Sequence, residues 1–291
     1  MFNFTLANFF SGYRINLIFM DLISKHKNCL KSSINFNQIS GSFPFNTWNG
    51  DLNSCLDGNI LHYDEIDKCF NSYDQSIRLN FSNIFLKKED FFNGYNKVIL
   101  EKAQNGSTAI ELSNLQLYYY IKENYPHYNK FVLSPNAWEI IDLNPKEINK
   151  ILNNSDFQLV SLPFKVANDF NYINQIENKN KIEICVNPWC PSYCRHYSKC
   201  IAEECLNQYD FSEKSVFAEC PKTYVYSNNP QTLSLEDLEE KYVRKGINHF
   251  KIASCPNHRI IQYFSFLVKY FIKDECQNQF LEKGLFLITN N

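Results

Sequence analysis

The sequence predicts a (β/α)8-type TIM barrel, formed by residues 1–291 as a single domain and irregular near the N-terminus. From about residue 75 onward, short apolar runs alternate with longer segments of helical periodicity. The first four steps from one run to the next are roughly 22 to 31 residues long, which is the length of a βαβ unit. The runs also carry few charges, as is typical of parallel strands that are covered on both faces.

The predicted elements follow in order along the chain. Strands are expected at residues 77–81, 108–112, 130–133, 157–161, 181–186 and 247–253, and helices at 89–104, 115–124, 145–152, 166–177, 234–244, 259–272 and 276–283. Asn144 and the Ser234–Asp237 capping box mark two helix starts. Nearer the N-terminus, residues 16–20 and 42–45 are expected as strands and 64–73 as a helix. The total of seven or eight strands favours a barrel, with an open doubly wound sheet as the alternative.

Composition excludes several classes of protein. Apolar residues make up 44%, which is enough for a large core, and the net charge of −2 does not indicate binding to a polyanion such as bulk DNA. The sequence contains no glycine-rich nucleotide-binding motif. The N-terminal stretch has no basic signal-peptide region, and no run reaches the ~18 apolar residues that span a bilayer. We therefore expect a cytoplasmic protein with reduced thiols, which favours metal binding over disulfides.

The most informative stretch is KIEICVNPWCPSYCRHYSKC, in which a predicted strand ends in a thiol-rich loop. Cys190 and Cys194 have CxxxC spacing, and Cys194 stands at a predicted helix start, where a thiolate is stabilised. We predict Cys190, Cys194, Cys200 and Cys220 as metal ligands, with Cys205 or the distant Cys55 left open for the fourth position. Cys29, Cys69, Cys185 and Cys276 are expected as core residues.

The spacing of these thiols limits the kind of metal site. A structural zinc site usually shows paired CxxC sequences, and none is present. The CxxxCxxC pattern of a radical-SAM cluster is broken because Tyr197 occupies the third position. A [4Fe–4S] cluster with one or two distant ligands therefore fits best, and zinc is the alternative.

Polar side chains follow the predicted strands at the end where barrel enzymes carry their chemistry. We predict a substrate-binding mouth formed by Asn80, Ser113, Ser134, Asn187 and Lys251. The alternative is that the Ser and Asn residues cap the helices that follow them. Carboxylates are scarce at these positions, so a glycosidase-type acid/base pair is not expected.

Several segments resemble the peptidase U32-like group of TIM-barrel proteins. They are GSFPFNTWNG, IRLNFSNIFL, ELSNLQLYYYIKENYPHYNKFVLSP, IEICVNPWCPSYCRHY and SLEDLEEKYVRKGINHFKIAS, within residues 41–272. The resemblance implies a [4Fe–4S] cluster held by four cysteines and oxygen-independent hydroxylation of ubiquinone precursors or RNA, in some cases by heterodimers of two such barrels. Cys190, Cys194 and Cys220 match positions where that group has cysteines. The CxxxC spacing is shorter than in its hydroxylating members.

The predicted function is that of an iron–sulfur TIM barrel, a hydroxylase-type enzyme or subunit acting on a small-molecule or RNA substrate. A non-catalytic partner barrel with a structural metal is the first alternative. A protease is the second, although the sequence contains no HExxH motif and no recognisable Ser/His/Asp arrangement. No catalytic residue is assigned.

Overall fold

A computed structural model gives the fold of the chain. It describes residues 1–7, 12–43, 46–50, 63–92, 94–104, 106–188, 197–210, 232–253 and 260–290, without the side chains of 204 and 207–210. Cys55, Cys190, Cys194 and Cys220, all considered above as metal ligands, lie outside these ranges.

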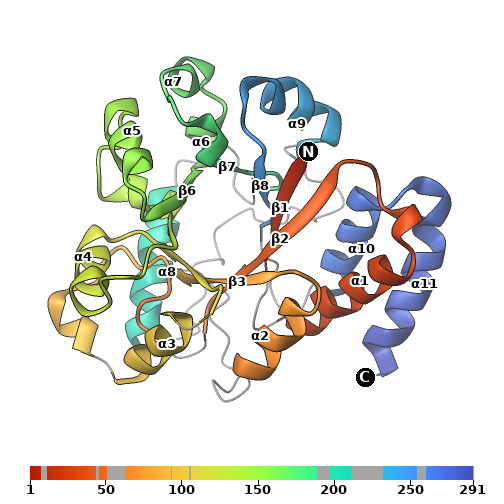
Figure 1. Ribbon diagram of the computed structural model, residues 1–291, viewed down its shortest axis with the longest axis horizontal. Coiled ribbons are helices and arrows are strands. Elements are labelled where there is room, and N and C mark those ends of the chain that lie inside the picture. Colours follow the sequence, from red (N-terminus) through yellow and green to blue (C-terminus); the bar gives the residue numbers. More distant parts are fainter. Residues whose placement is uncertain are drawn as a thin grey trace.

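Eight parallel strands close into a barrel, in which each strand pairs with its neighbours in sequence and β8 pairs with β1 (Figure 1). The strands are β1 (Phe2–Leu6), β2 (Ile34–Gly41), β3 (Ser76–Phe81), β4 (Ala109–Leu112), β5 (Phe131–Leu133), β6 (Phe157–Leu162), β7 (Ile182–Cys185) and β8 (His249–Lys251). This confirms the predicted TIM barrel and excludes the open sheet.

Helices surround the barrel (Figure 1). They are α1 (Tyr13–Lys25), α2 (Tyr63–Asn71), α3 (Gly94–Gln104), α4 (Leu115–Asn124), α5 (Pro145–Asn153), α6 (Phe164–Ala167), α7 (Phe170–Asn174), α8 (Tyr197–Asp210), α9 (Leu235–Lys241), α10 (Ile260–Phe271) and α11 (Asp274–Asn290). The predicted caps are present: the Asn144 side chain accepts from the first turn of α5, and Ser234 and Asp237 form a capping box at α9.

The strands divide their side chains between two environments because successive residues of a strand point to opposite faces. In β3, Ile77, Leu79 and Phe81 are fully buried and belong to the hydrophobic core, whereas Arg78 contacts polar side chains of other strands. In β1, Phe4 packs edge-on against Phe271 of α10 at 4.8 Å between ring centroids. The main apolar core therefore lies between the strands and the helices, and the barrel interior is polar.

The N-terminal strand prediction was wrong. Residues 16–20 lie within α1, where the buried Ile15, Phe19 and Leu22 recur at helical spacing. The first strand is β1, whose five residues are too few to show a clear period in the sequence. The second is β2, which ends at Gly41, before the predicted segment 42–45.

The last two helices form a closely packed pair beside α1 (Figure 1). Gly284 of α11 has no room for a side chain, since a Cβ atom there would lie 1.9 Å from Cζ of Phe264 on α10. Glycine thus permits the close approach of the two helices. Among the described helices, none combines the length and apolar character needed to cross a membrane.

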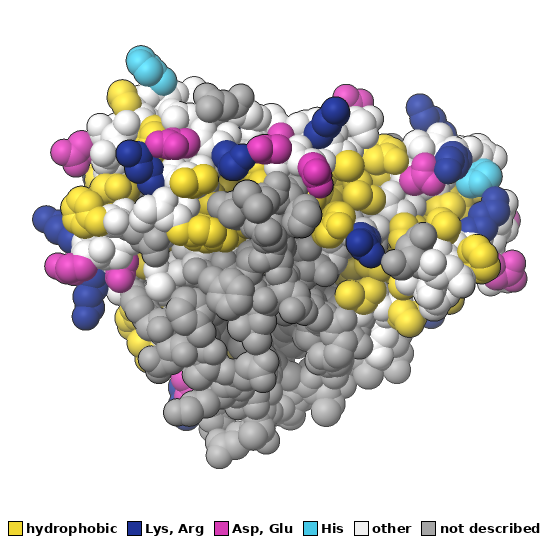
Figure 2. Space-filling model, turned by 90° about the horizontal axis from the view of Figure 1, so that it is seen from below, with side chains coloured by type: hydrophobic (Ala, Val, Ile, Leu, Met, Phe, Trp, Pro, Cys, Tyr) yellow, Lys and Arg dark blue, Asp and Glu magenta, His cyan; other side chains and the backbone are white. Residues whose placement is uncertain are grey.

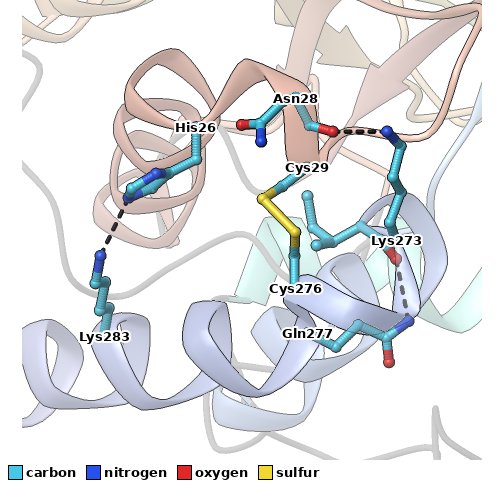
Figure 3. Close-up of a disulfide and its surroundings, with 8 residues drawn as sticks. His26, Asn28, Cys29, Lys273, Cys276, Gln277 and Lys283 are labelled. Atoms are coloured by element: carbon cyan, nitrogen blue, oxygen red, sulfur yellow. Dashed lines mark hydrogen bonds between the residues drawn. A yellow bond between two sulfur atoms is a disulfide. The ribbon is translucent and has the colours of Figure 1, made fainter.

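A disulfide joins Cys29, at the end of the segment after α1, to Cys276 in the first turn of α11 (Figure 3). Backbone hydrogen bonds flank it, from Lys273 N to Cys29 O and from Lys31 N to Phe271 O, both 2.9 Å. Cys29 is buried as expected, but the expectation that Cys29 and Cys276 are reduced thiols was wrong, and Cys69, expected in the core, is exposed. The two cysteines are 247 residues apart in sequence, so no local pattern reveals their pairing.

Charges of both signs are interspersed on the described surface shown in Figure 2, where Lys and Arg side chains lie among Asp and Glu. A surface with interspersed charges of both signs produces no single dominant electrostatic field. It agrees with the small net charge of the sequence.

Removal of the disulfide by Cys29→Ser is expected to lower the free energy of unfolding by about 4 kcal/mol, because the cross-link closes nearly the whole chain. Urea unfolding followed by circular dichroism measures this change. Cys69→Ser, at an exposed thiol that forms no disulfide, is the matched control. Equal stability of the Cys29→Ser variant and the wild type in the absence of reductant would contradict the prediction.

Candidate functional site

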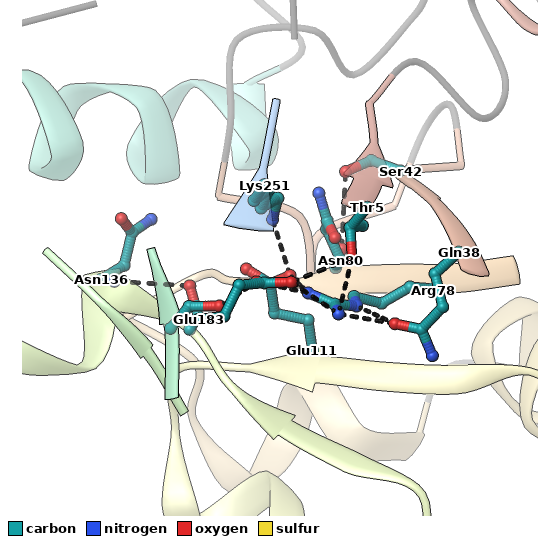
Figure 4. A network of polar contacts seen from close by, with 11 residues as sticks. Thr5, Gln38, Ser42, Arg78, Asn80, Glu111, Asn136, Glu183 and Lys251 are labelled. Carbon is teal, nitrogen blue, oxygen red and sulfur yellow. Dashed lines mark hydrogen bonds and ion pairs between the residues drawn. The ribbon is translucent and has the colours of Figure 1, made fainter. Parts of the chain in front are cut away.

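Arg78 lies in the interior of the barrel, fully buried, and hydrogen-bonds through every nitrogen of its guanidinium group (Figure 4). Its Nε donates to Gln38 Oε1 at 2.8 Å, and its terminal nitrogens donate to Glu183 at 2.7 and 2.9 Å. A further bond of 3.1 Å reaches Thr5 Oγ1. Burying a charge in a protein interior is energetically costly unless the charge is paired and hydrogen-bonded. These hydrogen bonds therefore make it possible for the Arg78 guanidinium to lie inside the barrel.

Glu183 of β7 is equally enclosed. Its two oxygens accept four hydrogen bonds, two from Arg78, one from Thr5 at 2.9 Å and one from Ser161. Burial by itself would raise the pKa of this carboxyl, but the charge and hydrogen bonds of Arg78, with Lys251 and Ser161, outweigh it and lower the pKa to about 2. Glu183 is therefore ionised at neutral pH and has no role as a proton donor there.

Glu111 of β4 and Lys251 of β8 form a second, less enclosed ion pair, 2.7 Å apart (Figure 4). The Lys251 side chain is 16% exposed and the Glu111 side chain 3%. Arg78 Nη1 approaches the same Glu111 oxygen at 3.4 Å, so the two pairs form one network. Its members come from every strand except β5: Thr5, Gln38, Arg78, Glu111, Ser161, Glu183 and Lys251.

The charges of this network cancel, with two cations, Arg78 and Lys251, against two carboxylates. His249, which pairs in register with Glu183, adds no charge at neutral pH because burial lowers its pKa.

Sequence reasoning missed Arg78, Glu111 and Glu183. The signal was a single charge between apolar neighbours inside a short strand, as in SIRLNF, AIEL and IEIC.

The predicted substrate residues lie at the C-terminal ends of the strands, with different local roles. Asn187 Oδ1 accepts from Ala253 N at 2.7 Å and joins the ends of β7 and β8. Ser134 caps the 3₁₀ helix Pro135–Glu139, as the helix-cap alternative anticipated. Asn80 and Ser113 are buried at the ends of β3 and β4, and Lys251 is the ion-pair partner described above.

The segment 46–50 covers the barrel mouth on the side of β3 and β5. Trp48 is fully buried and donates its indole N–H to Asp90 O at 2.9 Å. Gly50 has no room for a Cβ, which would lie 2.2 Å from Ser82 O, and its carbonyl accepts from Asn136 at 3.4 Å. Glycine is required here by the close approach of two backbones.

Helix α8 follows β7 in sequence but packs against the loop after β3. Asn83 Nδ2 donates to Cys205 O at 3.2 Å and to Thr47 O at 2.7 Å, which ties α8 to segment 46–50. Cys205 forms a small apolar cluster with Ile84 and Ile201. Helix α8 therefore packs on the opposite side of the barrel from β7, the strand that precedes it in sequence.

The four predicted metal ligands are only partly within the described residues. Cys200 is buried in the first turn of α8, whereas Cys190, Cys194 and Cys220 lie outside the described ranges. Within those ranges, no group of three or more His, Cys, Asp or Glu side chains is arranged to hold a metal. Burial raises the pKa of the Cys185 thiol to about 11, although the nearby positive charge of Lys251 acts to lower it. This thiol therefore stays protonated at neutral pH.

Comparison with known proteins finds similarity at the level of structure. No protein-family model and no curated protein matches the sequence. Among solved structures, the U32 peptidase Mk0906 superposes with a TM-score of 0.54 over 88% of this chain and 94% of that chain, at 9% identity. The fold is U32-like. At this identity the U32-like match establishes the fold alone, because one fold hosts many functions.

Glu183→Gln is expected to lower the free energy of unfolding by about 3–5 kcal/mol, because it leaves the buried Arg78 without its main counter-charge. Urea unfolding at pH 7 measures the loss. Glu177→Gln on the surface is the matched control. A loss below about 1 kcal/mol, the value of an exposed pair, would contradict the buried network.

The stability advantage of wild type over Glu183→Gln is expected to shrink in acid. Since the folded-state pKa is lowered from 4.5 to about 2, the contribution of Glu183 is complete above pH 4.5 and is lost as pH falls toward 2. Between pH 5 and pH 3 the difference in unfolding free energy is expected to fall by about 2 kcal/mol. Urea unfolding of both proteins at each pH measures it, and a constant difference would contradict the assigned pKa.

Proposed function

We propose that this chain is an enzyme or enzyme subunit of the U32-like type, which binds a small polar substrate at the C-terminal mouth of the barrel and holds a [4Fe–4S] cluster beside it. The observation that carries the proposal is the course of α8. This helix leaves its expected place beside β7 and β8 and packs on the loop after β3, with Ile84 and Asn83 as its contacts. It thereby places a helix that carries Cys200 and Cys205 beside the end of the barrel where TIM-barrel enzymes carry their chemistry.

The proposed ligands are Cys190, Cys194, Cys200 and Cys220. Helix geometry supports Cys200 over Cys205 for the fourth position, because residues five apart point about 140° away from each other. The Cys205 sulfur lies 3.5 Å from Ile84 N and 3.9 Å from Ser82 O, toward the loop after β3. Cys200, also buried, therefore points in another direction. Four thiolates are the donor set that iron–sulfur clusters use, so the residues fit the group.

When bound, such a cluster would supply one-electron redox chemistry. At the polar end of the barrel, Lys251 and Glu111 would offer hydrogen bonds to a substrate. Arg78 and Glu183 lie deeper, with their hydrogen bonds already made, and hold the strands that carry these groups. The reaction proposed is an oxygen-independent hydroxylation of a small molecule or an RNA, carried out alone or in a heterodimer with a second U32-like barrel, in the cytoplasm.

A non-catalytic partner barrel is the second candidate, favoured by the complete satisfaction of Arg78 and Glu183, which is the state of a structural core. Peptidase activity is not proposed. The sequence contains no HExxH motif and no recognisable Ser/His/Asp arrangement. The two candidates differ in redox behaviour: the proposed enzyme has a cluster that cycles between two oxidation states, and the partner barrel has a structural metal that does not.

Anaerobic reconstitution of the full chain is expected to give about four iron and four sulfide per protein, with the broad visible absorption of a [4Fe–4S] cluster. Iron and sulfide analysis together with electron paramagnetic resonance after reduction measures this. Protein that stays colourless and free of iron would refute the proposed cofactor. Zinc bound at one equivalent, without redox change, would support the structural alternative.

Cys200→Ala and Cys205→Ala form a matched pair on the same helix. We expect Cys200→Ala to lose most of the cluster absorbance and Cys205→Ala to keep it, with α8 and the fold retained in both. Circular dichroism checks the fold, and iron per protein measures the loss. Loss of iron from Cys205→Ala alone would reverse the assignment of the fourth ligand.

A further inference from the structure

The Glu111–Lys251 pair is incompletely hydrogen-bonded for its burial. Within the described chain, Glu111 Oε2 takes both of its contacts, with Lys251 and with Arg78, and Oε1 accepts none. Lys251 Nζ has Glu111 as its one described partner, although an ammonium group carries three N–H donors. The neighbouring Arg78–Glu183 pair, by contrast, uses all of its donors and acceptors.

Three further polar atoms near the same end of the barrel are buried without a hydrogen-bond partner in the described structure. They are Ser40 Oγ, Ser113 Oγ and Asn187 Nδ2. The three residues are 1%, 0% and 4% exposed. Ser40 lies on β2, two positions beyond Gln38, and therefore shares its face of the strand. Ser113 and Asn187 follow the ends of β4 and β7, two positions beyond Glu111 and four beyond Glu183, so all three residues lie nearer the mouth than the network.

Buried polar atoms of this kind are rare, and each costs about 1–3 kcal/mol when it is left without a partner. These three atoms lie at the same end of the barrel as Glu111 and Lys251, whose own hydrogen bonding is incomplete. Together the groups indicate that the hydrogen bonds are completed by a ligand. The set contains both donors and acceptors of hydrogen bonds. The donors are an ammonium group, an amide N–H and two hydroxyls, and the acceptor is a carboxylate oxygen.

The charge of the site restricts the ligand further. Arg78 and Lys251 cancel Glu111 and Glu183, and His249 is neutral, so the described lining has no net charge. A ligand with a net charge would therefore bring an uncompensated ion into a buried site, which is costly. A ligand with one positive and one negative group would bring no net charge into the site.

We propose that this site, formed by Glu111, Lys251, Ser40, Ser113 and Asn187, binds the zwitterionic head of a free α-amino acid. The α-carboxylate accepts from Lys251 and Asn187, and the α-ammonium donates to Glu111 Oε1. The ammonium and carboxylate of an α-amino acid are attached to one carbon, and the Lys251 and Glu111 charges are likewise adjacent, 2.7 Å apart. The two pairs of charges can therefore lie side by side with opposite signs facing each other. This inference rests on the proposed function only in taking the mouth as the substrate site.

Isothermal titration calorimetry of the full chain, with and without anaerobic reconstitution of iron, tests the inference. The probes are the common L-amino acids, each at 10 mM, which is about tenfold above a millimolar dissociation constant, with propionate, ethylamine and glycerol as carboxylate, amine and neutral controls. Saturable heat from at least one amino acid, and none from the three controls, is expected. Absence of heat from every amino acid, or equal binding of propionate or glycerol, would overturn the inference.

Glu111→Gln and Lys251→Met are each expected to weaken that binding at least about tenfold, the value of one lost charge-assisted hydrogen bond. Ser113→Ala separates binding from folding, because it removes an unpaired hydroxyl: it is expected to weaken binding a few-fold while the melting temperature stays equal or rises. Lys165→Met is the control for loss of a lysine. The half-exposed side chain of Lys165 forms an ion pair with Glu139. Unchanged binding in Ser113→Ala and Lys251→Met would overturn the site.

The iron content separates this inference from the proposed function. Amino-acid binding by protein that takes up no iron supports the site and refutes only the cluster. A complete cluster in protein that binds no amino acid refutes the site and leaves the cluster in place.

Discussion

The buried guanidinium of Arg78 is the constraint around which the barrel interior is arranged. TIM-barrel interiors are usually filled by layers of branched apolar side chains, but here a cation occupies the centre and must be neutralised where water cannot do so. Glu183 supplies the charge from the opposite side of the barrel, and Thr5, Gln38 and Ser161 complete the hydrogen bonds. Because the partners come from different strands, the network also fixes the closure and register of the barrel.

The two ends of the barrel use cysteine in different ways. At the end opposite the mouth, Cys29 and Cys276 are oxidised and join the N-terminal helix region to the last helix. Near the mouth, Cys200 lies on α8, close in sequence to the other thiols proposed as cluster ligands. In a barrel fold the first end is concerned with stability and the second with chemistry. The disulfide and the proposed cluster thus place opposite redox requirements on one chain.

The likeness to the U32 peptidase Mk0906 concerns the path of the chain. The superposition covers nearly all of both proteins, yet only 9% of the aligned residues are identical. Eight parallel strands with a polar interior can be maintained by many sequences, provided that helices cover the outer faces and each buried charge has a partner. At the mouth, the Glu111–Lys251 pair differs from the enclosed Arg78–Glu183 pair beneath it in its incomplete hydrogen bonding.

The sequence by itself determined the alternation of strands and helices from residue 75 onward, the helix starts at Asn144 and Ser234, and hence the parallel barrel, because periodicity and capping are local properties. It also indicated polar strand ends. Only the tertiary structure decided which distant groups meet: Arg78 with Glu183 across 105 residues, and Cys29 with Cys276 across 247. The same holds for α8, which packs on the loop after β3. A strand pattern tells which side chains face inward, but the partner of each is set by barrel closure, a property of the whole chain.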